Sequence, residues 1–326
     1  MSYKPPYAIT SKIIDLISKI SLNIGKLEAK EADTNLPMLR KINQIRTITG
    51  TLQIEGNTLD EDRITALLEG KRVLGTVNEL AEAKGAIALY KQIHTLNFLD
   101  EKDLLKSHKI LMDELLKKAG SYRNSDVGVG GRDGVVHVAP PQSQVPSLMD
   151  DLFAWLKATD EHPLISSSVF HYEFEFIHPF ADGNGRMGRF WQSLILQSWN
   201  STFSIIPIES IVRDKQQEYY KVLEICGSDG ESTVFIEFML ESIFEAIEKV
   251  GNRVGNRVGN LTQNQQIIVE QIMQNSKVSA DKLSDVVGIS KRKIEENLAK
   301  LKEKGILQRV GGTRGHWEVL EKEILI

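Results

Sequence analysis

The chain has 326 residues, roughly twice the length of a typical domain, so two domains are expected. Hydrophobic residues make up 41% and charged residues 26%, an ordinary globular composition that excludes a disordered or fibrous chain. Forty basic residues against 44 acidic ones give a net charge of −4. No global field therefore draws the whole chain to nucleic acid or to an anionic membrane.

Compartment can be inferred from cysteine content and from apolar runs. The single cysteine, Cys226, permits no internal disulfide and indicates a reducing compartment. No uninterrupted apolar run approaches the roughly 20 residues of a membrane span, and the first residues lack the apolar segment of a signal peptide. We therefore expect a cytoplasmic protein with no membrane partner.

Apolar residues recur at helical spacing over most of the first 250 residues. The predicted helices include 13–24, 103–119, 145–157, 166–177 and 231–250. Residues 120–141 differ, because glycines alternate there with β-branched residues and two prolines end the segment. A Gly-Gly-Arg-Asp-Gly stretch between valine-bearing arms predicts a surface β-hairpin with unpaired edges.

A domain boundary is expected near residue 250. The repeated Val-Gly-Asn-Arg unit at 250–260 predicts a linker. Beyond it, Thr262 and Ser290 are candidate helix N-caps, and 306–310 and 316–320 form two β arms around a glycine-rich turn. Residues 261–326 are therefore predicted to be a winged helix-turn-helix, and the fold class is mainly α with a small β-hairpin flap.

The most informative segment is His178-Pro-Phe-Ala-Asp-Gly-Asn-Gly-Arg-Met-Gly-Arg189. Glycines followed at once by a helix predict an anion-binding helix N-terminus. Arg186 and Arg189 are three residues apart, so both project from one helix face and suit an oligophosphate. Asp182 is a hard carboxylate fit for Mg²⁺, and His178 can take a proton near neutral pH.

The same segment allows two other interpretations. Gly183 to Gly188 matches GxGxxG literally, and Glu209 follows at the distance a dinucleotide fingerprint requires. No βαβ alternation surrounds it, however, and such turns do not carry two arginines. The plainer alternative is that His178 and Asp182 only cap helices.

The segment resembles the Fic signature HPFxDGNGRxxR at every fixed position, and the resemblance extends over about residues 1–250. It implies an N-terminal helical region (1–100) and a catalytic core (101–249) with a flap at 123–141. Gly120-Ser-Tyr122-Arg123 resembles the family's lead into that flap. The implied activity is transfer of AMP from ATP, with Mg²⁺, to a hydroxyl side chain of a protein target docked on the flap.

The resemblance also implies residue roles. His178 would be the general base, Asp182 the Mg²⁺ ligand, and Phe180 an apolar plug within the nucleotide-binding loop. Gly183, Asn184 and Gly185 would line the anion hole, Arg186 would neutralise the β- and γ-phosphates, and Arg189 would clamp the γ-phosphate. A compact Gly185 also favours nucleotidyl transfer, because kinase-type relatives carry a lysine there.

Further nucleotide contacts are implied at the flap residues Val129, Gly130 and Gly131. On the adenine side the resemblance implies Tyr219 and Tyr220, for which a core aromatic pair is the alternative. Gly227 stands where some relatives have an asparagine, so one adenine hydrogen bond is not expected.

Thr51-Leu-Gln-Ile-Glu55-Gly56-Asn57 resembles the family's inhibitory motif. A carboxylate delivered by Glu55 to Arg189 would occupy the charge partner that the γ-phosphate needs. In some relatives the same glutamate helps to remove AMP again.

A second hypothesis is a DNA-binding regulator. Residues 290–305 carry six basic and three acidic side chains, a modest net charge of +3. Docking of a protein target or of a second subunit, including a homodimer, is an equally good explanation for 261–326.

Overall fold

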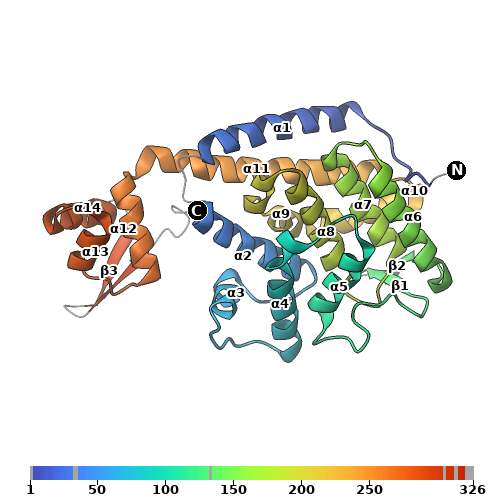
Figure 1. The fold of residues 1–326 in the computed structure, drawn as a ribbon, viewed down its shortest axis with the longest axis horizontal. Helices are drawn as coiled ribbons and strands as arrows, with labels where there is room; N and C mark the ends of the chain where they lie inside the picture. The colour runs from blue at the N-terminus through green and yellow to red at the C-terminus, as the bar shows by residue number, and fades with distance from the viewer. Residues whose placement is uncertain (1–2, 32–35, 132–133, 304–305, 312–314, 320–326) are drawn as a thin grey trace. The chain divides into compact units, whose positions relative to one another are not determined.

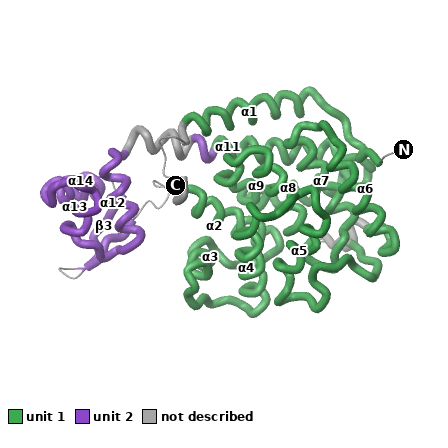
Figure 2. Tube along the Cα trace, viewed as in Figure 1, with its two compact units in different colours: residues 1–248 green, residues 249–326 purple. Residues whose placement is uncertain are grey.

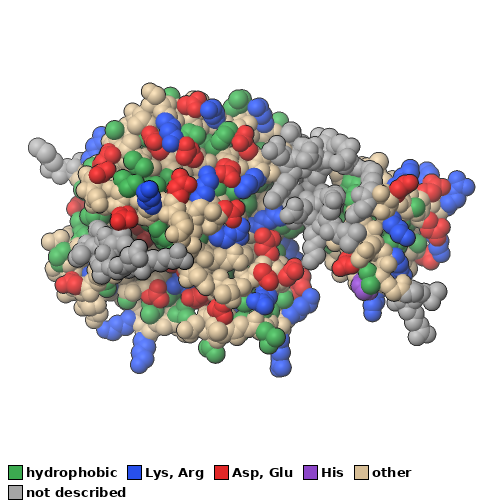
Figure 3. Space-filling model, turned by 180° about the vertical axis from the view of Figure 1, so that it is seen from behind, with side chains coloured by type: hydrophobic (Ala, Val, Ile, Leu, Met, Phe, Trp, Pro, Cys, Tyr) green, Lys and Arg blue, Asp and Glu red, His purple; other side chains and the backbone are tan. Residues whose placement is uncertain are grey.

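The computed structural model describes residues 3–31, 36–131, 134–303, 306–311 and 315–319, and at 30–31, 36–38, 129–131, 134–138 and 252–260 it describes the backbone alone. Two compact units are present, residues 1–248 and residues 249–326 (Figure 2). Acidic and basic side chains are interspersed on the face of unit 1 drawn in Figure 3. Among the described residues, no helix is both long and apolar enough to cross a membrane.

The first unit is built of helices, as predicted (Figure 1). They are α1 (Ser11–Glu31), α2 (Leu36–Ile54), α3 (Glu61–Leu68), α4 (Val77–Tyr90), α5 (Glu101–Met112), α6 (Val145–Ala158), α7 (Pro163–Ile177), α8 (Asn184–Trp199), α9 (Ile208–Asp214), α10 (Gln216–Asp229) and α11 (Thr233–Asn260), with 3₁₀ turns at Ile93–Thr95, Gln142–Gln144 and Ser201–Ile205.

Helices α7 and α8 form the centre of this unit. They pack against each other, and α7 is buried along nearly its whole length. Aromatic rings fill the space around them: Phe170 lies 5.6 Å from Phe153 and 6.3 Å from Trp191, measured between ring centroids. A rigid aromatic core therefore fixes the two helices that flank the signature loop.

The N-terminal helix α1 has the predicted helical period. Its buried residues are Ile13, Leu16, Ile20, Ile24 and Leu27, whereas Ile14 is 58% exposed. In its first turn, Lys12 forms ion pairs with Glu237 and Glu241 of α11. The spacing of apolar residues therefore predicts this helix correctly, although Ile14 faces solvent.

The predicted hairpin is present as β1 (Gly128–Gly131) and β2 (Gly134–Val138), paired antiparallel with an irregularity between Val129 and Gly130. The central Arg132-Asp133 of the expected turn lies outside the described residues. The predicted helix over 103–119 is shorter than expected, because α5 ends at Met112 and turns follow.

The segment 250–260, predicted as a linker, is helical in the structure. Helix α11 continues through Asn260, and the reason lies in the repeat itself. Val250, Val254 and Val258 recur every four residues, a spacing compatible with an α-helix, even though Gly and Asn lower the helix propensity.

The second unit contains three helices followed by two antiparallel strands. These are α12 (Gln263–Gln274), α13 (Ala280–Val287), α14 (Lys291–Glu303), β3 (Leu307–Val310) and β4 (His316–Val319). Thr262 forms a capping box with Gln265 at the start of α12. The unit has an apolar core of its own, in which Ile268, Leu283 and Ile294 are fully buried. Residues 312–314 and 320–326 of the predicted wing lie outside the described residues.

Candidate functional site

The signature loop connects the end of α7 to the start of α8. His178 follows α7 in a left-handed conformation (φ 49°, ψ 59°), and its N–H donates to the carbonyl of Phe174. Gly183 precedes α8 with φ 83°, where a Cβ would lie 2.8 Å from the sulfur of Met112. His178 and Gly183 thus both have a left-handed backbone conformation. Glycine adopts this conformation without strain, whereas histidine does not.

Asn184 shapes the loop from inside. Its side-chain oxygen accepts the N–H of Phe180 at 2.8 Å, and its amide nitrogen donates to the carbonyl of Phe180 at 2.9 Å. Through these two hydrogen bonds the side chain of Asn184 holds the loop in shape. Phe180 is fully buried, as expected of an apolar plug.

A histidine that the sequence did not single out supports the same loop. The ring of His108 stacks on Phe180, with centroids 3.6 Å apart. The N–H of Gly120 donates to its Nδ1 at 2.9 Å, so its Nε2 carries the proton and donates to the carbonyl of Asp182 at 3.0 Å. Burial lowers the pKa of His108 to about 4, which keeps this ring neutral.

Arg186 is held at the opening of α8 by two carboxylates. Its Nη2 lies 3.3 Å from Asp182 Oδ1, and its Nη1 lies 3.3 Å from Glu82 Oε1 on α4. Asn57 in turn donates to the other oxygen of Glu82. Asp182 also accepts the N–H of Gly183, and its side chain is 59% exposed.

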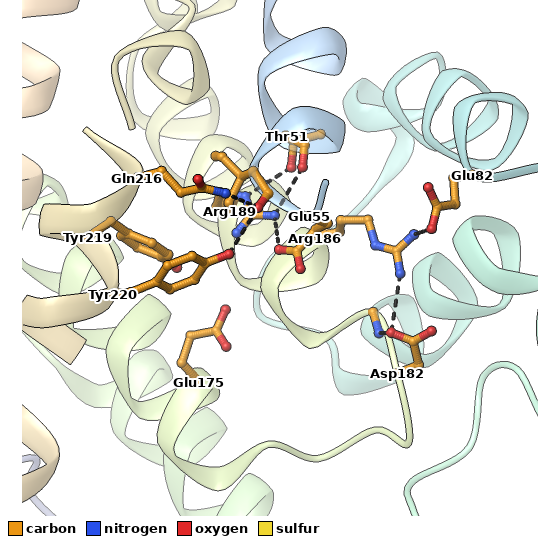
Figure 4. A network of polar contacts seen from close by, with 12 residues as sticks. Thr51, Glu55, Glu82, Glu175, Asp182, Arg186, Arg189, Gln216, Tyr219 and Tyr220 are labelled. Atoms are coloured by element: carbon orange, nitrogen blue, oxygen red, sulfur yellow. Dashed lines mark hydrogen bonds and ion pairs between the residues drawn. The ribbon is translucent and has the colours of Figure 1, made fainter. Parts of the chain in front are cut away.

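Arg189 forms the predicted ion pair with Glu55. Glu55 Oε1 lies 2.6 Å from Arg189 Nη2, as Figure 4 shows. Arg189 also donates from Nε to the hydroxyl of Thr51 and from Nη2 to its carbonyl. Although burial alone would lower it, the Glu55 carboxylate raises the pKa of Arg189.

Gly185 makes this approach sterically feasible. A Cβ at position 185 would lie 2.5 Å from Glu55 Oε1 and 3.0 Å from Arg189 Nη1. Real Cβ atoms do not approach an oxygen this closely, so a side chain here would displace the Glu55 carboxylate.

The end of α2, directly before Glu55, is fixed by α10. Gln216 and the hydroxyl of Tyr220 both donate to the carbonyl of Ile54. Tyr220 is 42% exposed, whereas Tyr219 is 1% exposed and its hydroxyl lies 3.1 Å from His171 Nε2. Of the predicted pair, Tyr220 therefore has an accessible ring and Tyr219 belongs to the core.

A carboxylate that the sequence analysis did not predict, that of Glu175, lies beside Glu55 and Tyr220. Glu175 projects from α7 into the space next to Tyr220 and Glu55 (Figure 4). Burial raises its pKa to about 8, although the nearby Arg189 acts in the opposite direction.

Three guanidinium nitrogens in this cluster are buried and have no hydrogen-bond acceptor among the residues that the structure describes: Arg186 Nε, Arg186 Nη1 and Arg189 Nη1. The Arg186 Nη1–Glu82 contact is an ion pair without hydrogen-bond geometry. Buried donors seldom lack a hydrogen-bond acceptor, and several such donors side by side suit an anionic ligand.

The structure thus brings together most of the predicted residues. His178, Phe180 and Asp182 lie in the loop, residues 183–189 follow into α8, and Glu55 and Tyr220 lie on adjoining elements. Val129, Gly130 and Gly131 lie in β1, whose side chains are outside the description. The sequence assigned no role to Glu82, His108, Arg123 or Glu175; Glu82 and His108 reach the loop through contacts distant in sequence.

Comparison with known proteins agrees with this geometry. A family model described as Fic/DOC family matches residues 98–196. A crystal structure of a Fic family protein from Desulfovibrio desulfuricans G20 is 38% identical, covers 98% of this chain and 99% of that chain, and superposes with a TM-score of 0.74. The fold is that of the Fic proteins, and this chain belongs to the Fic family.

More distant relatives share only part of the chain. Protein adenylyltransferase Fic of Aedes aegypti is 28% identical over 223 residues, which is 64% of this chain and 42% of that protein. The protein of the same name from Culex quinquefasciatus is 28% identical over 220 residues, with the same coverage. This chain therefore spans less than half the length of these curated relatives. Fic-1 from C. elegans, at 20% identity and a TM-score of 0.59, shares the fold over 73% of this chain and 71% of that one.

Proposed function

We propose that this chain is a self-inhibited protein adenylyltransferase that transfers AMP from ATP to a hydroxyl side chain of a protein. The observation that carries the proposal is that Arg186 and Arg189, in the first two turns of α8, are buried and hold three nitrogens without a hydrogen-bond acceptor among the described residues. Several such donors beside a glycine-bearing loop suit an oligophosphate. The printed names of the insect relatives support AMP transfer as the reaction.

The chemistry follows from the groups that the loop presents. The His178 imidazole accepts the proton of the target hydroxyl as that oxygen bonds to the α-phosphorus. The bond from the α-phosphorus to the bridging oxygen breaks, and pyrophosphate leaves with the electron pair. Arg186 and Arg189 neutralise the charge that grows on the leaving group, so the contribution of the protein is mostly positioning and charge compensation.

Asp182 fits the Mg²⁺ that ATP brings. A solvent-accessible carboxylate is a suitable single protein ligand, because Mg²⁺ in nucleotide sites takes one or two carboxylates and completes its shell with phosphates and water. Among the described residues, no cluster of three or more acidic, histidine or cysteine side chains could hold a metal ion alone. Bound Mg²⁺ would supply charge neutralisation on the phosphates.

Self-inhibition rests on the Glu55–Arg189 contact of 2.6 Å. The carboxylate occupies the charge that a γ-phosphate would use, and its own charge repels that phosphate. Tyr220 and Gln216 hold the end of α2 at Ile54, so Glu55 is delivered by a fixed element rather than by a loose chain. ATP then binds with its α-phosphorus turned away from in-line attack.

The proposal is tested by intact-mass measurement after incubation with Mg-ATP, with the protein itself as a hydroxyl donor. We expect AMP addition by Glu55→Gly to exceed that of the wild type by about tenfold or more, equivalent to about 1.4 kcal/mol of barrier. In Glu55→Gly combined with Arg189→Ala the gain should largely vanish, because no γ-phosphate clamp remains to be released. The double-mutant cycle measures that non-additivity.

Glu114→Gly is the matched control. Glu114, like Glu55, lies in a turn directly after a helix, and its partner is the exposed Lys84 rather than a signature arginine. It should behave as the wild type. If Glu55→Gly adds no AMP to itself or to any hydroxyl-bearing acceptor protein, the proposed activity is wrong.

For the second unit we propose a winged helix-turn-helix that binds duplex DNA, supported by the order of three helices and an antiparallel strand pair. Lys293 and Lys300 lie exposed on α14, whereas Lys291 and Arg292 are paired with Asp281 and Glu296. Duplex affinity that falls steeply with salt would support this role, and salt-independent binding would contradict it.

A further inference from the structure

Arg123 lies between the β-hairpin and the signature loop and is buried without a close carboxylate. Its side chain is completely buried, and the nearest acidic oxygen described, on the exposed Asp126, is 3.9 Å from Nη1. Burial lowers the pKa of Arg123. A buried cation needs compensation, and here it comes from backbone carbonyls.

Those carbonyls belong to two separate structures. On the loop side, Arg123 Nε donates to the carbonyl of His178 at 2.8 Å and Nη2 donates to that of Ile177 at 3.4 Å. The backbone N–H of Arg123 donates to the carbonyl of Pro179 at 2.9 Å. These are the last carbonyls of α7 and the first of the loop, where the negative end of the helix dipole favours a cation.

On the hairpin side, Arg123 reaches both ends of the strand pair. Nη1 donates to the carbonyl of Ser125 at 2.9 Å, before β1, and Nη2 donates to the carbonyl of Pro140, after β2. One guanidinium therefore joins the entry and the exit of the hairpin to the backbone of His178. A lysine ammonium could not do so, because it presents its donors from a single atom rather than from a planar fork.

Arg123 holds the carbonyl of His178, a residue whose backbone conformation is unusual. His178 has φ 49°, the only positive φ of a residue other than glycine among those described. Such a conformation costs of order 1 kcal/mol or more and persists only where the surroundings determine it. The hydrogen bond from Arg123 Nε acts on that peptide unit and hence on the direction of the imidazole.

We propose that Arg123 is a positioning residue that couples the hairpin to the backbone of His178, so that the element on which a target would dock and the residue that takes its proton move as one body. The part of this inference that concerns target docking and proton transfer rests on the proposed function. The other part, that Arg123 anchors both the hairpin and the loop, does not depend on that function.

The first experiment measures amide hydrogen exchange by mass spectrometry in the full chain, on peptides that cover 124–141 and 177–183. In Arg123→Ala we expect exchange in both peptides to rise together, by about tenfold or more, because both lose one anchor. Added guanidinium ion should slow both again. Arg46→Ala removes another buried guanidinium, from α2, and should leave both peptides unchanged.

The second experiment measures AMP transfer in the Glu55→Gly background. Arg123→Ala should lower kcat by about 100-fold, as misplacement by about 1 Å does, while KM for ATP changes by less than about twofold. Guanidinium ion should recover part of kcat, and Arg123→Lys should not restore it. A purely structural role would instead lower the melting temperature and weaken ATP binding, without rescue by guanidinium.

The two arms separate the possible failures. If Glu55→Gly with Arg123 intact transfers no AMP, the proposed function fails, and the exchange arm still tests the coupling. If Arg123→Ala leaves exchange unchanged, or alters only one of the two peptides, the coupling is wrong. If Arg123→Ala does not fold, Arg123→Lys provides the exchange and kcat comparison without the guanidinium arm, because lysine keeps the charge and lacks the planar fork.

Discussion

At the scale of single residues, the site depends on backbone conformations that side chains elsewhere impose. His178 lies in the left-handed region just beyond α7, between a helix C-terminus and a loop clamped by Asn184. Its imidazole makes no phosphate contact in the proposed reaction. Loss of that ring should therefore affect chemistry and leave nucleotide binding in place.

We predict that His178→Ala, in the Glu55→Gly background, lowers the rate of AMP transfer by about 10²–10⁴-fold, the usual contribution of a general base. Affinity for ATP, measured by titration calorimetry, should stay within about twofold of the parent. Near-normal transfer by His178→Ala would remove the general-base assignment.

Gly185 offers a steric test of the inhibitory contact. A methyl group there would lie 2.5 Å from Glu55 Oε1, so Gly185→Ala should expel the carboxylate that Glu55→Gly deletes. We predict more AMP transfer than in the wild type, by about a few fold to tenfold. In the Glu55→Gly background the same change should raise transfer no further. Further activation there would show that Gly185 acts through something other than Glu55.

The residues that sequence could and could not predict differ in the range of their contacts. The residues from His178 to Arg189 are contiguous in the sequence, so their order and spacing can be recognised without the structure. Glu82 and His108 reach this loop from 104 and 74 residues away in the chain, measured to Arg186 and Asp182. A carboxylate on a helix and a histidine on an apolar face have no local pattern, so only the folded chain identifies their partners.

At the scale of elements, α5 supports the signature loop through a neutral histidine. Because the pKa of His108 is about 4 in the fold and about 6.5 in an unfolded chain, the unfolded state binds the additional proton as pH falls. The contribution of His108 to stability is thus fully present above pH 6.5 and is lost as pH falls toward 4. The loss is on the order of 1.4 kcal/mol per pH unit.

We predict that His108→Gln removes this dependence. The free energy of unfolding in urea, compared at pH 7 and pH 5, should fall less in His108→Gln than in the wild type. The comparison of two proteins cancels the opposite contribution of Glu175, whose raised pKa favours the fold as pH falls. His94→Gln, at an exposed position, is the control and should keep the wild-type slope. An unchanged slope in His108→Gln would refute the neutral-histidine assignment.

Helix periodicity predicted the elements of the core well, and its errors have physical causes. The hairpin was recognisable because glycines and β-branched residues alternate where a helix would not. The repeat at 250–260 predicts a linker because it lacks apolar periodicity, whereas the structure has this segment as the end of α11. Four-residue spacing of valines was the better indicator, since a helix already under way adds residues at little cost.

At the scale of the whole molecule, the proposed chemistry belongs to one unit. Every residue placed in it, from Thr51 on α2 to Tyr220 on α10, lies within residues 1–248. The second unit has its own buried core, built from Leu261 to Leu307. Each unit therefore has the apolar interior needed to fold without the other.

Removal of the second unit tests that independence. We predict that Glu55→Gly in a chain that ends at residue 260, which keeps α11 whole, transfers AMP at a rate within about twofold of the full-length variant. The reason is that the truncation removes no side chain of the loop, of α8 or of the Glu55 cluster. The thermal transition of the first unit should persist, and circular dichroism should retain its helical signal. If the shortened chain folds but loses transfer by about tenfold or more, the second unit supplies part of the site, and assignment of the chemistry to unit 1 alone is wrong.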